Sequence, residues 1–373
     1  MVAVGVRHDA PNEYVFLARS TYAHPVTLGR ISLLLGVLAV TCSRPRSTRG
    51  LPSPRPTASS PAAQAPSCVG DRRMTVHFYD VGQGLAALVV LPDGRHILVD
   101  TGDSPRRPGC GEPCASSDRH LLGKLSSDLH GAPIDMLWVT HQHSDHIGGA
   151  PEVFEAFKVV MYVDNGRDSR KSEVRRAHQA AEEHGTVVRV VDPDHAKAPI
   201  SGSADVKITP ILPGDWPTSC LHDANECSIA LRIDYCSSSV LFTGDAEHDE
   251  EAHLDPHGPV TLLQVAHHGS ETSTTPAFLA KTRPRYAVLS AGKPGEGMNA
   301  DYCHPRALIV KRLTATLGGA GTKTVRSFDG DRCDRAQPSD WIDVLASDRL
   351  WATERDGDVV LTTTGDGTFV QAE

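Results

Sequence analysis

From Met74 onward, apolar residues occur in short runs that alternate with polar residues and turns. The first three runs are MTVHFYDV (74–81), LAALVVL (85–91) and RHILVDTG (95–102), and glycine or Pro-Asp-Gly turns separate them. The run IDMLWVT (134–140) is apolar almost throughout, which predicts a buried strand. The first half of this region is therefore expected to be rich in β-strands.

Helices and strands are expected to mix in the remainder of the chain. Helical patterns are expected over 119–129, 170–184, 276–282 and 305–316. Further strands are expected at TVVRVV (186–191), VKITPIL (206–212), SIALRIDY (228–235), SVLFTGD (239–245), VTLLQVAHH (260–268) and RYAVLS (285–290), with a closing hairpin at about 350–370. This order favours an α/β (α+β) fold of two sheets covered by helices.

The N-terminal segment reads as an export signal. Residues 31–41 (ISLLLGVLAVT) form an apolar run behind Arg19 and Arg30. This run is shorter than the roughly 20 residues that span a bilayer, and it is typical of a secretory signal. Cys42 follows directly, as in a lipoprotein signal, so 1–42 is predicted to be a signal peptide or a lipoprotein-type export segment. An uncleaved or disordered N-terminus is the alternative.

Residues 43–71 are rich in proline and serine and hold almost no large apolar residue, which predicts a flexible linker. The folded domain is expected to occupy 72–373. The net charge of the chain is −9, and because 1–71 hold seven Arg, no Lys and three acidic residues (+4), the remainder carries −13. Such a surface does not attract long nucleic acid unless a local basic patch exists.

The cysteines point to disulfides. Besides Cys42 there is an even set of eight, and an even set in an exported chain favours bridges over metal binding. Eight cysteines allow 105 pairings, so the sequence does not assign partners to Cys68, Cys110, Cys114, Cys220, Cys227, Cys236, Cys303 and Cys333.

The strongest chemical signal follows the buried strand directly. The segment THQHSDHIGG (140–149) places four ligand-type side chains within six residues: His141, His143, Asp145 and His146. Imidazole and carboxylate are common ligands of Zn²⁺ and related divalent ions. A polar, solvated loop is the alternative, but three histidines and an aspartate at this spacing favour a metal site.

These residues resemble the H-x-H-x-D-H motif of metallo-β-lactamase-fold hydrolases, and more narrowly the hydrolase domain of ComEC-like competence proteins. Other segments follow that family's order: FYDVGQG (78–84), ILVDTG (97–102), NECSIALRIDY (225–235), LFTGDAE (241–247), QVAHHGSETS (264–273), CHP (303–305) and ERDGDVVLTTTGDG (354–367). The resemblance implies an αββα sandwich of two mixed β-sheets flanked by helices. This chain departs from the pattern at Leu85, where relatives often carry Asp, and at 318–349, which looks like an insertion.

The resemblance also implies metal ligands. His141 and His143 would bind a first ion, Asp145 and His146 a second, and Asp245 would bridge the two. His267 would complete the second site. Two divalent ions, Zn²⁺ or Mn²⁺, are the implied cofactors. The third ligand of the first ion stays open between Asn225, His222 and none.

Three further residues are given roles beyond metal binding. His268 would bind substrate phosphate or pack behind the site, and His304 would lie near the substrate, although a structural histidine is the alternative. Asp145, His268 and His304 are thus the expected catalytic residues. Asp100 is expected to orient the metal loop rather than bind metal.

The expected function is hydrolysis outside the cytoplasm. Two adjacent ions would share a water molecule and lower its pKa, which supplies a hydroxide nucleophile. A phosphodiesterase or nuclease of ComEC-like type fits best, with a phosphodiester such as single-stranded DNA as substrate and the N-terminus as a route of membrane attachment. The alternatives are a hydrolase of a lactam, lactone or phosphorylcholine-type ester, and a non-catalytic surface metal-binding protein.

Overall fold

In a computed structural model of the chain, the residues described are 72–168, 170–194, 200–203 and 205–372. The expected export segment (1–42) and linker (43–71) lie outside them. No helix among the described residues is long and apolar enough to cross a membrane.

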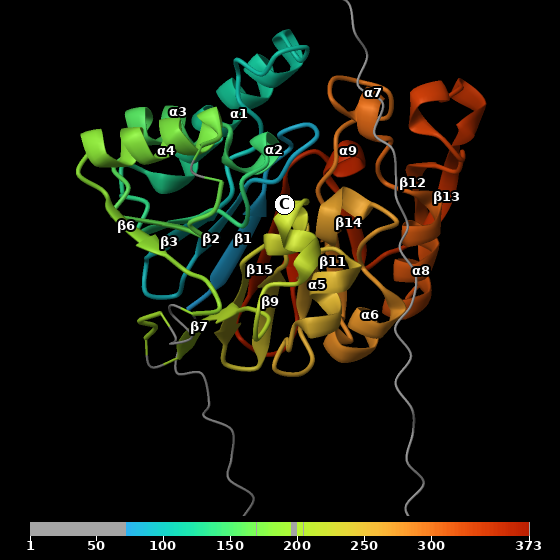
Figure 1. Cartoon of the computed structure of the whole chain (residues 1–373). Coiled ribbons are helices and arrows are strands. Elements are labelled where there is room, and N and C mark those ends of the chain that lie inside the picture. Colours follow the sequence, from blue (N-terminus) through green and yellow to red (C-terminus); the bar gives the residue numbers. More distant parts are fainter. Residues whose placement is uncertain (1–71, 169, 195–199, 204, 373) are drawn as a thin grey trace, which may run out of the picture. The chain divides into compact units, whose positions relative to one another are not determined.

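Two mixed β-sheets form the centre of the fold (Figure 1). The larger sheet has the order β16-β15-β1-β2-β3-β4-β5-β6. Its strands are β1 (Met74–Phe78), β2 (Ala87–Val90), β3 (His96–Val99), β4 (Met136–Trp138), β5 (Met161–Asp164), β6 (Val187–Val190), β15 (Val359–Thr363) and β16 (Val370–Gln371). Strands β3 to β6 run parallel to one another, whereas β1, β2, β15 and β16 pair antiparallel.

The second sheet has the order β14-β11-β10-β9-β8-β7. Its strands are β7 (Val206–Ile211), β8 (Ala230–Tyr235), β9 (Ser238–Phe242), β10 (Leu262–Gln264), β11 (Tyr286–Leu289) and β14 (Leu350–Ala352). Apolar side chains from both sheets form one continuous core between them. Phe78 of β1 and Phe242 of β9, for example, bring their ring centroids to 5.7 Å.

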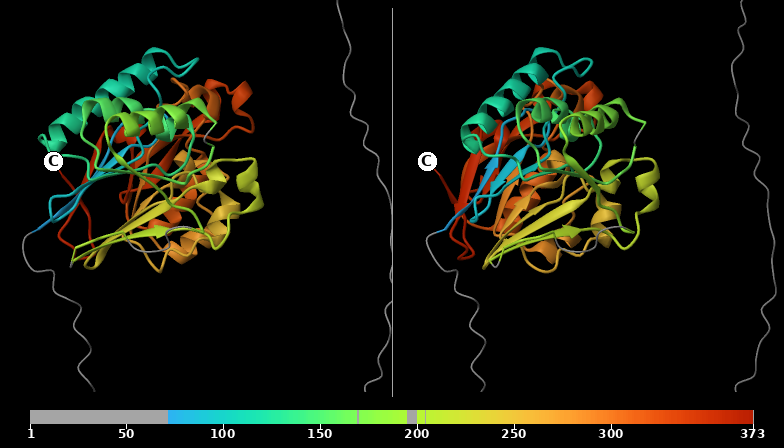
Figure 2. Two further views of the ribbon diagram at one scale, coloured as in Figure 1. Left: turned by 60° about the vertical axis from the view of Figure 1, so that its left-hand side comes forward. Right: turned by 90° about the vertical axis from the view of Figure 1, so that its left-hand side faces the viewer.

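Helices cover the outer face of each sheet (Figure 2). The larger sheet packs against α1 (Glu112–Leu129), α3 (Ala150–Ala156) and α4 (Ser172–Glu183). The second packs against α6 (Pro276–Thr282) and α8 (Ala307–Leu317), with α5 (His248–His253) beside α6. The short helices are α2 (Ser144–Ile147), α7 (Asn299–Tyr302) and α9 (Thr353–Asp356). The expected αββα sandwich is confirmed.

The closing hairpin expected at 350–370 is wrong at its first strand. Strand β14 pairs in parallel with β11 of the second sheet, whereas β15 and β16 pair antiparallel in the larger sheet and form the closing hairpin. Helix α9 and Gly357, which has φ 68°, redirect the chain between the sheets. The segment 318–349, which was expected to be an insertion, contains a separate hairpin of β12 (Gly321–Phe328) and β13 (Trp341–Ser347) that contacts α8.

The expected use of cysteine in disulfides is confirmed for the described residues. Three bridges join Cys110 to Cys114, Cys220 to Cys227 and Cys303 to Cys333. Cys236 is also disulfide-bonded.

Candidate metal centre

The predicted ligands meet where the parallel strands of both sheets end. Asp100 follows β3, and the loop His141–His146 follows β4 in the larger sheet. Asp245 follows β9, and His267 and His268 follow β10 in the second sheet. Because neighbouring parallel strands end at the same edge of a sheet, residues far apart in the sequence gather there.

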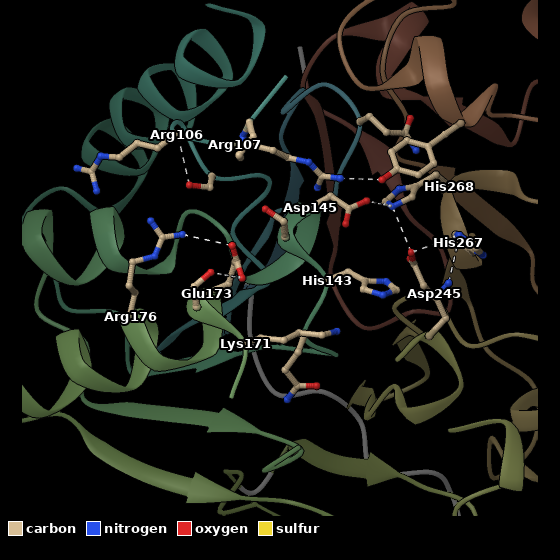
Figure 3. A pocket seen from close by; sticks show the side chains of 18 of the residues that line it. Arg106, Arg107, His143, Asp145, Lys171, Glu173, Arg176, Asp245, His267 and His268 are labelled. Carbon is tan, nitrogen blue, oxygen red and sulfur yellow. Dashed lines mark hydrogen bonds and ion pairs between the residues drawn. The ribbon is translucent and has the colours of Figure 1, made fainter. Parts of the chain in front are cut away.

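Four buried side chains form the centre of this gathering: Asp145, His146, Asp245 and His268. One ligand atom from each lies within 4.8 Å of the others. The Oδ2 atom of Asp245 lies 3.2 Å from Nε2 of His146 and 3.4 Å from Nε2 of His268. The Oδ2 atom of Asp145 lies 3.5 Å from Nε2 of His268. Figure 3 shows Asp145, Asp245 and His268 pointing toward one another.

A second group of donors adjoins Asp245. Nε2 of His141 is 4.0 Å from Oδ2 of Asp245, and the ring centroids of His141 and His143 are 4.9 Å apart. Buried Nε2 of His141 and Oδ1 of Asp245 have no hydrogen-bond partner among the described residues. Since buried polar atoms are normally satisfied, these atoms are suited to hold a cation.

The electrostatics of the centre fit divalent ions. Burial and the neighbouring His146 hold the pKa of His141 well below its usual range, so its ring is neutral, which is the form that binds metal. Burial raises the pKa of Asp245, but His146 and His268 outweigh it and lower that pKa well below the ordinary value. Burial lowers the pKa of His268, but the carboxylates of Asp245 and Asp145 outweigh it and raise that pKa to about 10. The cluster thus attracts positive charge, which divalent ions could supply in place of protons.

Hydrogen bonds behind the cluster orient its imidazoles. Oδ2 of Asp100 lies 2.7 Å from Nδ1 of His146 and accepts from the Thr140 hydroxyl at 2.8 Å, while its Oδ1 accepts from the Thr140 backbone N–H at 2.7 Å. Nδ1 of His268 lies 2.8 Å from the Ser290 carbonyl oxygen. A ring that donates from Nδ1 keeps Nε2 as its ligand atom. These contacts are the ones that the orienting role expected for Asp100 requires.

The two adjacent histidines occupy different places. His268 lies in the cluster, whereas Nε2 of His267 is 3.9 Å from Oδ2 of Asp245 and its Nδ1 is 3.0 Å from Oε1 of Glu247. Both residues have left-handed backbone angles, φ 48° and 53°. This turn after β10 places His268, rather than the expected His267, among the four clustered side chains. Glu247, which the motif reasoning did not single out, anchors His267.

The two candidates for a third ligand of the first ion, Asn225 and His222, lie in different places. Asn225 lines the cleft above the cluster, and its buried Oδ1 has no hydrogen-bond partner among the described residues. His222 is exposed and is not among the residues that line the cleft. His304 does line it, with its ring centroid 5.4 Å from that of His267 and its buried Nδ1 unpartnered within the described part of the chain.

The cleft has a volume of about 600 Å³, and one part of its lining was missed by sequence reasoning. Four basic residues line it: Arg106, Arg107, Lys171 and Arg176. The first three pair with Glu152, Asp103 and Asp168, none of which lines the cleft. The only acidic residues in the lining are Glu173 and the clustered Asp145 and Asp245. Arg176 pairs with Glu173 at 3.6 Å, so each of the four basic side chains has a carboxylate partner. Basic side chains therefore gather at this cleft on a chain whose net charge is negative.

The sequence is similar to those of known proteins. Residues 79–293 match the sequence model described as "Metallo-beta-lactamase superfamily". "Recombination protein 2" of Haemophilus influenzae is 30% identical over 218 residues, which are 57% of this chain and 24% of that protein.

Two further relatives match over a similar share of the chain. "ComE operon protein 3" of Bacillus subtilis is 28% identical over 249 residues, covering 64% of this chain and 30% of that protein. "Competence protein ComA" of Neisseria gonorrhoeae is 27% identical over 260 residues, covering 67% of this chain and 31% of that protein. The chain thus spans less than a third of the length of each of these three relatives.

Proposed function

Because this chain belongs to the metallo-beta-lactamase superfamily, we propose that it is a metal-dependent phosphodiesterase that acts outside the cytoplasm, with single-stranded DNA as its candidate substrate. The observation that carries the proposal is the juxtaposition of a buried histidine–carboxylate cluster with a cleft lined by four basic side chains. A phosphodiester brings negative charge to such a cleft, whereas a neutral lactam or lactone would make little use of it.

The residues divide into two ligand groups. We infer that Asp145, His146, Asp245 and His268 hold one divalent ion, and that His141 and His143 hold another next to Asp245. Zn²⁺ and Mn²⁺ both suit a mixture of imidazole and carboxylate. Such ions polarise a phosphoryl oxygen and lower the pKa of a bound water.

The surrounding side chains would handle the substrate. Buried Nδ1 of His304 lines the cleft without a partner among the described residues, so it can donate a hydrogen bond to a bound phosphodiester. The unpartnered Oδ1 of Asn225 can only accept, so it would suit a metal ion rather than the anionic substrate. Asp100 holds His146 in place, and the Ser290 carbonyl holds His268 in place. The basic side chains would attract the anionic substrate and position it.

Two observations support export. The described residues contain three disulfides, and such bridges persist mainly in oxidising compartments. The apolar run 31–41 has the length of a signal-peptide core.

The test is hydrolysis by the full chain, purified with its disulfides intact and loaded with Zn²⁺ or Mn²⁺. Bis(p-nitrophenyl) phosphate and a single-stranded oligonucleotide are the substrates, with chelated protein and Asp145→Ala as controls. Cleavage that is lost in both controls is the expected result. Hydrolysis of a lactam, a lactone or p-nitrophenyl phosphorylcholine, with no cleavage of either phosphodiester, would refute the proposal.

A further inference from the structure

Arg107 occupies an unusual position in the cleft. It lies in the loop between β3 and α1, and its side chain is only 19% exposed. One guanidinium nitrogen, Nη1, lies 3.0 Å from Oδ2 of Asp103. The other, Nη2, donates to the Tyr302 hydroxyl at 2.8 Å, across 195 positions of sequence. The Arg107–Tyr302 bridge thus joins a loop of the larger sheet to α7.

The anchor of this bridge is connected to the metal loop. Asp103 is buried, and its Oδ1 accepts hydrogen bonds from the Ser144 hydroxyl and, at 2.8 Å, from the Ser104 N–H. Ser144 precedes the clustered Asp145 directly. Arg107 is therefore held in a fixed relation to the candidate metal centre.

Disulfides lie beside both ends of the bridge. The Cys110 N–H donates to the Arg107 carbonyl at 3.2 Å, and Cys110 is bonded to Cys114. At the other end Cys303 follows Tyr302 directly and is bonded to Cys333. Both loops are thus restrained covalently next to the cleft.

We propose that Arg107 binds the phosphate that adjoins the scissile phosphate of a nucleic-acid strand; this inference rests on the proposed function. A guanidinium forms bidentate hydrogen bonds with phosphate oxygens. Within the described part of the chain, Asp103 and Tyr302 are the only hydrogen-bond partners of the Arg107 guanidinium, so N–H donors of that group remain for a ligand.

The placement of the other cations explains why a neighbouring phosphate is assigned. In Figure 3, Arg106 and Arg176 lie farther from the cluster than Arg107, so basic side chains continue along the cleft, although Arg176 pairs with Glu173 at 3.6 Å. A strand whose phosphates continue past the metal centre would meet these side chains in turn, with Arg107 first. Arg106 is 72% exposed, whereas Arg107 is already restrained and loses less conformational freedom on binding.

The first experiment measures binding without catalysis. The metal-free full chain is titrated into an octathymidylate that carries a 5′ fluorescein, over a range of salt concentrations. We expect Arg107→Gln to raise Kd about tenfold, because the variant loses a charge-assisted hydrogen bond to the strand. The slope of log affinity against log salt should fall by about 0.7, the value for one phosphate contact on a single strand.

Two variants control this measurement. Arg283→Gln removes an exposed arginine outside the cleft and should leave both quantities as in the parent. Tyr302→Phe keeps the Arg107 charge but removes its anchor, so it should weaken binding less and leave the salt slope unchanged. An unchanged Kd in Arg107→Gln, or an equal loss of slope in Arg283→Gln or Tyr302→Phe, would overturn the assignment.

The second experiment separates the neighbouring phosphate from the scissile one. The metal-loaded chain is assayed on octathymidylate and on the dinucleotide TpT, which has no phosphate beside the scissile one. Arg107→Gln should raise KM for the octamer about tenfold and should lower kcat/KM for TpT far less, because TpT loses only the general attraction of the basic cleft. An equal loss on both substrates would overturn the inference. If the parent hydrolyses neither, the proposed function fails, while the binding measurement still decides whether Arg107 contacts the strand.

Discussion

Single residues at the centre combine an unusual backbone conformation with a defined chemical task. Asp100 has φ 57°, in the left-handed region, and is fully buried. Its two oxygens accept from Thr140 and contact His146. Aspartate and asparagine are among the few non-glycine residues that tolerate this conformation. The position therefore demands both a backbone shape and a hydrogen-bond acceptor.

Replacing Asp100 with asparagine tests its orienting role. Asn keeps the backbone conformation but removes the charge that holds Nδ1 of His146 in its donor form. We expect Asp100→Asn to weaken metal binding by about 10–100-fold, the effect usual for a partner behind a metal ligand. Competition with a chromophoric chelator measures the affinity.

The matched control is Asp128→Asn, because Asp128 also pairs with a histidine, Nδ1 of His77 at 3.2 Å, but does not line the cleft. Metal affinity of Asp100→Asn equal to that of the parent would contradict the orienting role.

At the scale of elements, a buried carboxylate joins two helices that cover the second sheet, α5 and α6. Glu251 of α5 accepts from the backbone N–H groups of Thr274 and Thr275, at 2.6 and 2.8 Å, just before α6 begins. Glu251 is 1% exposed. Burial raises its pKa from 4.5 to about 7, although these N–H groups oppose the shift.

This raised pKa predicts how stability depends on pH. The folded protein binds the proton of Glu251 more tightly than the unfolded chain does. The stabilisation is therefore complete below pH 4.5 and is lost as pH rises through about 7. The shift corresponds to at most about 3 kcal/mol. Urea unfolding of Glu251→Gln should show a flatter decline between these pH values than the parent shows.

Glu183→Gln provides the control, because it removes an exposed glutamate from α4. A decline in Glu251→Gln as steep as that of the parent would show that another group causes it.

For the whole molecule, the candidate metal centre joins the two sheets. Asp145 and His146 come from the larger sheet, and Asp245 and His268 from the second. A ligand that binds the folded state alone stabilises that state. An ion held by side chains from both sheets should therefore stabilise the assembled sandwich.

Metal loading should raise the stability of the parent chain. At an ion concentration 100 times Kd, the free energy of unfolding should rise by about 2.7 kcal/mol relative to chelated protein. Thermal unfolding with and without chelator measures the difference. In Asp245→Ala, which lacks a carboxylate central to both ligand groups, the difference should shrink strongly. Equal stabilisation in that variant would place the ion elsewhere.

The local sequence determined much of the fold. Helix 276–282 and the strand at 74–78 follow from periodicity, since burial on one face imposes a pattern on consecutive residues. Strands β2 and β3 are buried almost throughout and were visible instead as apolar runs bounded by turns. The metal loop at 141–146 was equally visible, because its ligands lie within a few positions of one another. Residues 350–352 were expected in a closing hairpin but pair with β11 instead, because pairing partners depend on contacts distant in sequence.

Only the tertiary structure decided how the site is assembled. The sequence does not distinguish the adjacent His267 and His268. The left-handed turn after β10 decides which of them lies in the cluster with Asp245. The basic lining was hidden because Arg107, Lys171 and Arg176 belong to separate loops and helices in a chain of net charge −9. Periodicity and compact motifs are visible in the sequence because their residues are consecutive. A cleft is not visible there, because it forms from strand ends and loops that only folding brings together.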